Sequence, residues 1–131
     1  MSQNTENTPI IMVVEDDPNI LRQIEFNLKS HGYSVVTAIS GTDALRQMLL
    51  QRPTLLITDV MMPEMDGYEL VATLRRDNDL RDLPVIMLTA RTGENDMVQG
   101  YTSGTDLYLT KPFDPAELIA FVQRIMPSSG I

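Results

Sequence analysis

The chain has 131 residues, of which 43% are hydrophobic, enough for one domain with its own core. A formal net charge of −8 disfavours direct nucleic-acid binding, and the absence of cysteine excludes disulfides and thiolate chemistry. No apolar run approaches the roughly 18 residues of a membrane span, and the polar residues 1–9 do not form a secretory signal. We expect a cytoplasmic protein with one domain over residues 9–127, a loose tail over 1–8 and a short tail over 128–131.

The first predicted strand covers residues 10–14, which are all apolar, as is typical of a parallel sheet covered on both faces. Asp17 and Pro18 follow as a good N-cap and first helical residue. Apolar residues then recur at helical spacing until His31, where a following glycine predicts the end of the helix.

The second predicted strand covers residues 34–38, and Ser40 with Asp43 resembles a capping box that opens a second helix. Pro53 ends that helix. Residues 55–58 then predict a buried strand that runs directly into Asp59. In open α/β sheets ligands bind beyond the carboxyl ends of strands, so Asp59 is a candidate for chemistry, although aspartate also caps turns.

The remaining elements continue the alternation. The spacing of apolar residues predicts a third helix after Gly67, and residues 93–103 form a poorer helical pattern that Gly100 weakens. Two further strands and one final helix, with an N-cap, proline and acid at its start, are predicted over residues 84–88, 106–109 and 114–125.

Five strands alternating with five helices predict the α/β class, with right-handed crossovers and a doubly wound five-stranded parallel sheet. In such a sheet all the carboxyl ends lie at one edge. The chemistry-bearing residues that follow the predicted strands are Glu15, Asp16, Asp17, Asp59, Thr89 and Lys111. If the central strands are neighbours, we expect acids, a hydroxyl and an ammonium to converge there.

Converging carboxylates need a counter-charge, because two of them about 5 Å apart repel by roughly 3 kcal/mol at an effective dielectric constant of 20. One lysine cannot neutralise three acids, whereas a divalent cation can. Hard oxygen ligands without histidine or cysteine favour Mg²⁺, with Mn²⁺ as the alternative. With a phosphoryl group at that metal, Lys111 would neutralise its oxygens, Thr89 would donate a hydrogen bond and Asp59 would be the nucleophile that forms an acyl phosphate.

Simpler interpretations exist for each residue. Asp17 reads best as a helix cap alone, and Glu15 with Asp16 could form a merely solvated turn. Thr89 or Lys111 alone would be weak evidence for a functional site, and their positions at successive strand ends strengthen that interpretation.

The whole set of motifs resembles the receiver domain of bacterial response regulators over roughly residues 9–127. The motifs that carry this resemblance are Val13-Val14-Glu15-Asp16-Asp17, Asp59 with Met62-Pro63 and Asp66-Gly67, Leu88-Thr89-Ala90, and Tyr108 with Lys111-Pro112-Phe113. The resemblance implies a flavodoxin-like fold with strand order 2-1-3-4-5. It also implies a phosphoacceptor switch that receives a phosphoryl group from a histidine kinase or phosphotransfer protein.

By the same resemblance, Asp59 is the phosphoacceptor and Asp16 the direct metal ligand, while Glu15 acts on the metal mostly through water. The backbone carbonyl of Met61 is a further ligand. Residues implied in other roles are Thr89 and Tyr108 as a switch pair, Lys111 as the phosphate contact, and Pro112 after a cis peptide bond.

Phosphorylation adds roughly −1.5 to −2 charges at one point. Thr89 would move inward, and Tyr108 could swing into the space beside the helix predicted over residues 93–103, making that helix, the fifth strand and the last helix the output surface. Alternatively, Tyr108 is a half-buried strand aromatic. In the family the positions of Met61 and Arg91 tune loss of the phosphoryl group, and neither residue offers an acid or amide to orient water, so we expect a lifetime of minutes or more.

The main rival is a Mg²⁺-dependent phosphatase with an aspartyl nucleophile. Such enzymes usually carry a second acid two residues after the nucleophile, where this chain has Met61, so we expect it to catalyse only its own phosphorylation and dephosphorylation. A flavin carrier is disfavoured because the acidic turn after the first strand would repel its phosphate. A degenerate receiver would lack a key group, and none is missing. The output partner, an attached effector domain, and a monomer or a phosphorylation-dependent dimer all stay open.

Overall fold

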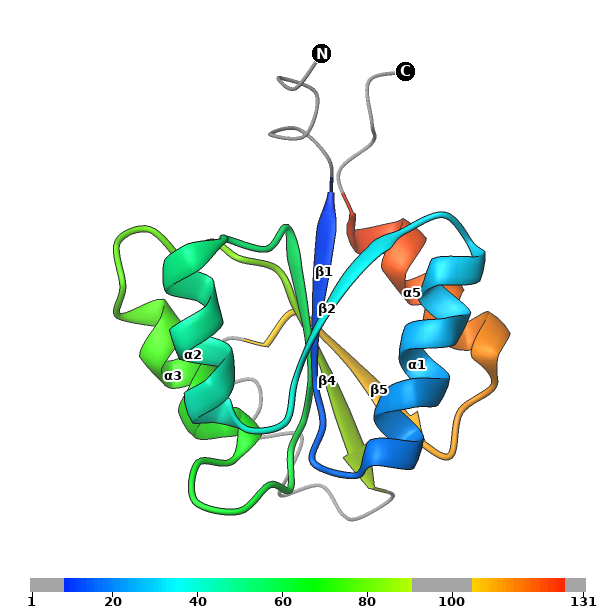
Figure 1. Cartoon of the computed structure of the whole chain (residues 1–131), viewed down its shortest axis with the longest axis horizontal. Coiled ribbons are helices and arrows are strands. Elements are labelled where there is room, and N and C mark those ends of the chain that lie inside the picture. Colours follow the sequence, from blue (N-terminus) through cyan, green and yellow to red (C-terminus); the bar gives the residue numbers. More distant parts are fainter. Residues whose placement is uncertain (1–8, 91–104, 127–131) are drawn as a thin grey trace.

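A computed structural model describes residues 9–90 and 105–126. Its centre is a parallel five-stranded sheet in the order β2-β1-β3-β4-β5 (Figure 1). The strands are β1 (Ile10–Val14), β2 (Ser34–Ala38), β3 (Leu55–Asp59), β4 (Val85–Ala90) and β5 (Leu107–Lys111). The predicted flavodoxin-like α/β topology is therefore confirmed. The strand order had come from the resemblance, because the periodicity of single strands does not determine their neighbours.

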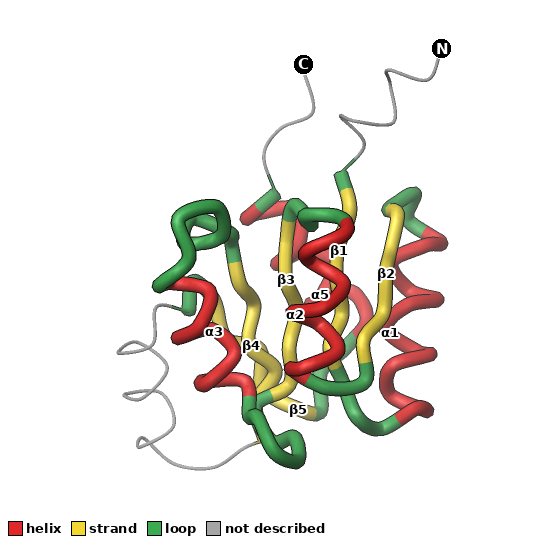
Figure 2. The backbone as a smooth tube through the Cα atoms, turned by 60° about the vertical axis from the view of Figure 1, so that its left-hand side comes forward, coloured by secondary structure: helices red, strands yellow, loops and turns green. Residues whose placement is uncertain are grey.

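Helices cover both faces of this sheet. One layer contains α1 (Pro18–Ser30) and α5 (Pro115–Ile125), and the opposite layer contains α2 (Gly41–Leu50) and α3 (Gly67–Arg75), as Figures 1 and 2 show. The helix predicted over residues 93–103 and both predicted tails, 1–8 and 128–131, lie outside the described residues. Within the described part, no helix is long and apolar enough to cross a membrane.

The core is divided by the sheet into two hydrophobic clusters. Alternate residues of a strand face opposite sides, so Met12 and Val14 of β1 pack in the cluster under α2 and α3. Ile11 and Val13 pack in the cluster under α1 and α5. Because both faces are covered, all five residues of β3 are buried, which explains the apolar run Leu55-Leu56-Ile57 at its start.

The helix starts follow the predicted capping residues. The side chain of Asp17 accepts a hydrogen bond from the backbone N–H of Asn19 at 2.9 Å, and Ser40 accepts one from Asp43 at 3.1 Å. In the last helix the side chain of Glu117 accepts a hydrogen bond from the Asp114 N–H at 3.0 Å. Each cap satisfies a backbone group that a helix leaves without an internal partner.

Two predicted strand ends were wrong. We expected β4 to end at Leu88 and the fifth strand at Leu109, but the ladder continues through Thr89, paired with Thr110, and Ala90, paired with Lys111. Strands are predicted from runs of apolar residues, so polar residues that extend the pairing at the carboxyl end of a strand are missed. Thr89 and Lys111 therefore lie within the paired strand ends and not in the loops that follow.

Candidate functional site

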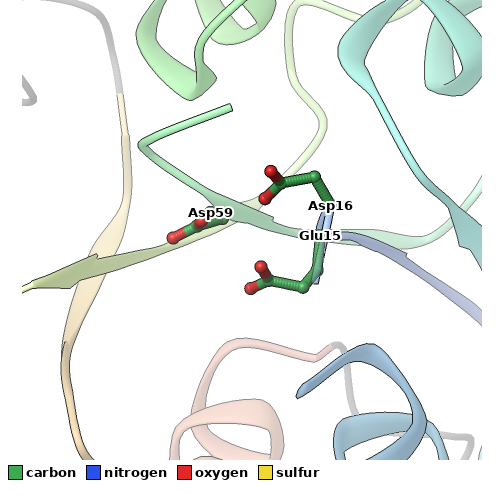
Figure 3. Close-up of side chains that lie close together, drawn as sticks. All are labelled: Glu15, Asp16 and Asp59. Atoms are coloured by element: carbon green, nitrogen blue, oxygen red, sulfur yellow. The ribbon is translucent and has the colours of Figure 1, made fainter. Parts of the chain in front are cut away.

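Three carboxylates meet at the carboxyl edge of the sheet. Glu15 and Asp16 follow β1, and Asp59 is the last residue of β3; these two strands are paired neighbours. One carboxylate oxygen from each of the three residues lies within 4.8 Å of the other two, and Figure 3 shows the side chains together at this edge. Strand adjacency thus brings together acids that are far apart in the sequence.

The acids differ in their exposure to solvent. Glu15 is only 1% exposed and Asp59 only 6%, whereas Asp16 is exposed. A backbone bond from the Glu15 N–H to the Ala38 carbonyl, 3.1 Å long, extends the β1–β2 ladder and fixes Glu15 at this depth. Its Oε2 also accepts a hydrogen bond from the Asp17 N–H at 3.2 Å. Two buried carboxylates side by side are costly unless cations compensate them.

Lys111 supplies one such cation. Its Nζ lies 2.9 Å from Oδ1 of Asp59 and 3.1 Å from Oε1 of Glu15, although β4 separates β5 from β3 in the sheet. The long lysine side chain therefore reaches across the end of β4 and bridges both buried acids.

The pKa values of these groups reflect burial and their mutual charges. Burial raises the pKa of Glu15, and the negative charge of Asp59 raises it further. Burial also raises the pKa of Asp59, against the opposing effect of Lys111. For Lys111 burial acts to lower the pKa, but the bonds and charges of Asp59 and Glu15 outweigh it and hold the pKa above its usual value.

The donor set fits a divalent cation. If all three acids are ionised, the single ammonium of Lys111 leaves two negative charges uncompensated. The side chains that converge offer only hard oxygens, which bind Mg²⁺, Mn²⁺ or Ca²⁺ in preference to softer metals. An acidic cluster at this edge is therefore consistent with a divalent metal site.

The other predicted site residues lie around this cluster in different states. The Thr89 hydroxyl donates a hydrogen bond to the Ala90 carbonyl at 2.9 Å, and Tyr108 is half-buried against the α2–α3 side of the core. The Lys111–Pro112 peptide bond is cis. The side chain of Met61 is 73% exposed, and the role of its carbonyl as a ligand stays a prediction.

Sequence reasoning missed two contacts of Glu15. It assigned Asp17 to helix capping alone, but the backbone of Asp17 also supports the Glu15 carboxylate. It assigned Lys111 to phosphate binding and did not anticipate its bond to Glu15. The three consecutive acids before Pro18 could have indicated the contact between Glu15 and the Asp17 N–H. A tight turn into a helix exposes backbone N–H groups to nearby carboxylates.

Comparison with known proteins decides the family. A family model described as the response regulator receiver domain matches residues 11–123. The chain belongs to this family. It is thus a receiver domain of the kind found in response regulators of two-component systems.

Several relatives resemble this receiver domain closely. The dual master transcriptional regulator RpaA of Synechocystis is 40% identical over 90% of this chain and 49% of its own length. Protein PilG of Pseudomonas aeruginosa is 39% identical over 90% of this chain and 87% of its own length. The structure of chemotaxis protein CheY4 of Vibrio cholerae matches with a TM-score of 0.86 and 32% identity, over 91% of this chain and 99% of that one.

The lengths of these relatives differ. The chain spans about half the length of the first curated relatives it matches, RpaA and the regulator PhoP of Bacillus subtilis, and most of the length of PilG. The receiver fold is therefore shared by proteins that contain much more than this domain and by proteins that contain little else.

Proposed function

We propose that this receiver domain is a phosphoacceptor switch in which Asp59 receives a phosphoryl group from a phosphohistidine of a histidine kinase or phosphotransfer protein. The observation that carries the proposal is the pairing of a buried Asp59 carboxylate with the Lys111 ammonium, beside two further acids. A carboxylate held beside a cation at a strand end is positioned to act as a nucleophile and to keep the phosphoryl group bound afterwards.

In the proposed step, a carboxylate oxygen of Asp59 attacks phosphorus, the O–P bond of an acyl phosphate forms and the N–P bond of phosphohistidine breaks. The departing imidazole keeps the electron pair and takes up a proton from solvent. Lys111 already contacts Asp59 Oδ1 and would bind an oxygen of the incoming group. Bound Mg²⁺, or Mn²⁺, would supply positive charge for the phosphoryl oxygens, and Glu15, Asp16, Asp59 and the Met61 carbonyl would hold it.

The signalling step follows from Thr89 and Tyr108. To reach a phosphoryl oxygen, Thr89 would turn its hydroxyl away from the Ala90 carbonyl. Tyr108, which packs half-buried beside β4, would follow that shift. The proposed output surface combines β5 and α5 with the helix predicted over residues 93–103, which lies outside the described residues.

Met61 distinguishes this role from that of a phosphatase. Met61 lies two residues after Asp59, and its side chain is exposed. A thioether cannot act as the general acid or base that the hydrolysis of external phosphate esters needs. We therefore propose that the chain catalyses only its own phosphorylation and slow dephosphorylation, with a phosphoryl lifetime of minutes or more. Arg91, the second position that bears on lifetime, lies outside the described residues.

Partners and setting follow from the switch. A histidine kinase or phosphotransfer protein supplies the phosphoryl group, and an output protein or an attached effector domain, as in the transcriptional regulators among the relatives, would read the state of Asp59. The net charge of −8 disfavours nucleic-acid contact by the domain itself. We propose a monomer or phosphorylation-dependent dimer that acts in the cytoplasm without binding membranes.

The test is incubation of the chain with Mg²⁺ and acetyl phosphate, followed by intact mass measurement. We expect a gain of one phosphoryl group that Asp59→Asn abolishes and that the exposed-site control Asp82→Asn retains. A phosphorylated Asp59→Asn variant, or a wild type without label at saturating donor and metal, would overturn the proposal.

A further inference from the structure

We propose that Gly67 is a positioning residue for Asp59: because residue 67 has no side chain, the first turn of α3 packs directly on the backbone of the phosphoacceptor and fixes where its carboxylate lies. This inference rests on the function proposed for Asp59. Gly67 opens α3 eight residues after Asp59 and has no chemical group of its own.

The space available at Gly67 shows how closely the two segments approach. A Cβ atom on residue 67 would lie 2.4 Å from the carbonyl oxygen of Asp59 and 3.1 Å from the Cα of Val60. It would also lie 2.8 Å from the Sδ of Met87. The Met87 side chain can move aside, but the Asp59 carbonyl is part of the backbone of β3 and can retreat only if the phosphoacceptor itself moves.

The approach is fixed by hydrogen bonds at both ends. The Gly67 N–H donates to the Val60 carbonyl at 2.8 Å, so the start of α3 is bonded to the residue that directly follows Asp59. Asp66 caps α3 reciprocally: its Oδ1 accepts from the Glu69 N–H at 2.8 Å, and its own N–H donates to Glu69 Oε1 at 2.9 Å. The start of α3 is thus a fixed support behind Asp59.

Close approach, and not backbone conformation, is the reason for glycine here. In the described chain the glycine with positive φ is Gly32, with φ of 91°, and Gly67 adopts an ordinary helical start. Gly41 offers a matched comparison, because it is also buried and also the first residue of a helix after an N-cap. A Cβ at Gly41 would meet the side chain of Met65, with its Sδ at 2.8 Å, instead of the backbone of the active site.

The experiment compares Gly67→Ala with Gly41→Ala in the same chain. The measurements are the free energy of unfolding in urea, the Mg²⁺ dissociation constant, the initial rate of phosphorylation by acetyl phosphate at saturating Mg²⁺, and the NMR chemical shifts of Asp59. Both variants add the same atom at the same helical position, so their effects on helix propensity are matched.

We expect the saturated phosphorylation rate of folded Gly67→Ala to fall about tenfold or more, because small displacements of a reacting group carry large kinetic costs. The Asp59 shifts should move as well. In Gly41→Ala the rate, the Mg²⁺ affinity and the Asp59 shifts should stay close to wild type, even where stability falls. Equal rates and equal Asp59 shifts in the two folded variants would overturn the positioning role.

Glu69→Ala covers the case in which Gly67→Ala fails to fold. Glu69 is exposed, and truncation of its side chain to alanine removes the hydrogen bond from the Asp66 N–H to Oε1 of Glu69 without adding atoms. We expect the saturated phosphorylation rate to fall about threefold with little loss of stability, and an unchanged rate together with unchanged Asp59 shifts would count as failure. The Asp59 shifts respond even when no phosphoryl group is transferred, so failure of the proposed function and failure of this inference remain distinguishable.

Discussion

Lys111 and Glu15 lie 96 residues apart in the sequence, yet Nζ of the lysine and Oε1 of the glutamate are 3.1 Å apart. The same ammonium contacts Asp59 at 2.9 Å. One cation therefore holds two buried carboxylates next to each other. On the function proposed above, we expect the stability of the domain and the reactivity of Asp59 to depend on the same three side chains.

Replacement of Lys111 by alanine should destabilise the metal-free domain by about 1–3 kcal/mol at neutral pH, because two buried acids lose their shared partner. Urea unfolding provides the measurement. Lys29→Ala is the control, since Lys29 pairs with Glu25 at the surface and should contribute less than about 1 kcal/mol. Added Mg²⁺ should reduce the penalty of Lys111→Ala, and equal losses in the two variants would contradict the bridging role.

The stability of the metal-free domain should depend on pH through Glu15 and Asp59. Burial raises both pKa values, so between the ordinary and the raised pKa the folded chain binds more protons than the unfolded chain. The contribution of these acids to the free energy of unfolding therefore falls as pH rises through that window. We expect Asp59→Asn to gain stability relative to wild type as pH increases. The control is Asp82→Asn, at an exposed position. If the stability of Asp59→Asn followed the same pH profile as that of the wild type, the effect would be excluded.

Metal binding should stabilise the folded state through Asp16. At ten times its dissociation constant Mg²⁺ adds about 1.4 kcal/mol to the free energy of unfolding. Asp16→Ala should lose this gain at the same concentration, yet match the metal-free wild type within about 0.5 kcal/mol because the side chain is exposed. Metal titration during urea unfolding checks both values. Equal stabilisation of the two proteins would locate the ion elsewhere.

Replacement of Tyr108 by alanine should separate phosphorylation from the conformational response. The side chain is half-buried on β5 and does not belong to the acid cluster, so the rate of phosphorylation by acetyl phosphate should change little. NMR shift changes that phosphorylation causes in α5 should shrink, since the element that transmits the change is lost. Wild-type shift changes in Tyr108→Ala would show that the signal takes another route.

Much of the fold could be predicted because buried parallel strands are rich in apolar residues and the helices begin at recognisable caps. Residues 10–14 and 34–38 were placed with their observed bounds, and Asp17 was identified as an N-cap. The ends of β4 and β5 could not be placed, because Thr89 and Lys111 are polar residues that pair only through their neighbours in the sheet.

The site divides in the same way. Parallel strands end at one edge of a sheet, so Asp59 and the Glu15–Asp16 turn could be expected to converge once β1 and β3 are neighbours, an order that the family resemblance implied. The bond between Lys111 and Glu15, and the approach of Gly67 to Asp59, depend on side-chain reach and on the tilt of a helix over a strand. Local sequence patterns predict neither the reach of a side chain nor the tilt of a helix, so these two contacts are visible only in the three-dimensional structure.

Because Glu15 directly follows β1, while Asp59 and Lys111 end β3 and β5, the proposed reactive centre exists only when these strands are assembled in the sheet. An unfolded chain retains the aspartate but has neither its lysine nor its acidic neighbours within reach. Phosphorylation of Asp59 by acetyl phosphate would therefore also measure whether the sheet is assembled. The phosphorylated fraction at each denaturant concentration should follow the unfolding curve of the whole domain. On the proposed function, a chain that has not finished folding would not accept a phosphoryl group.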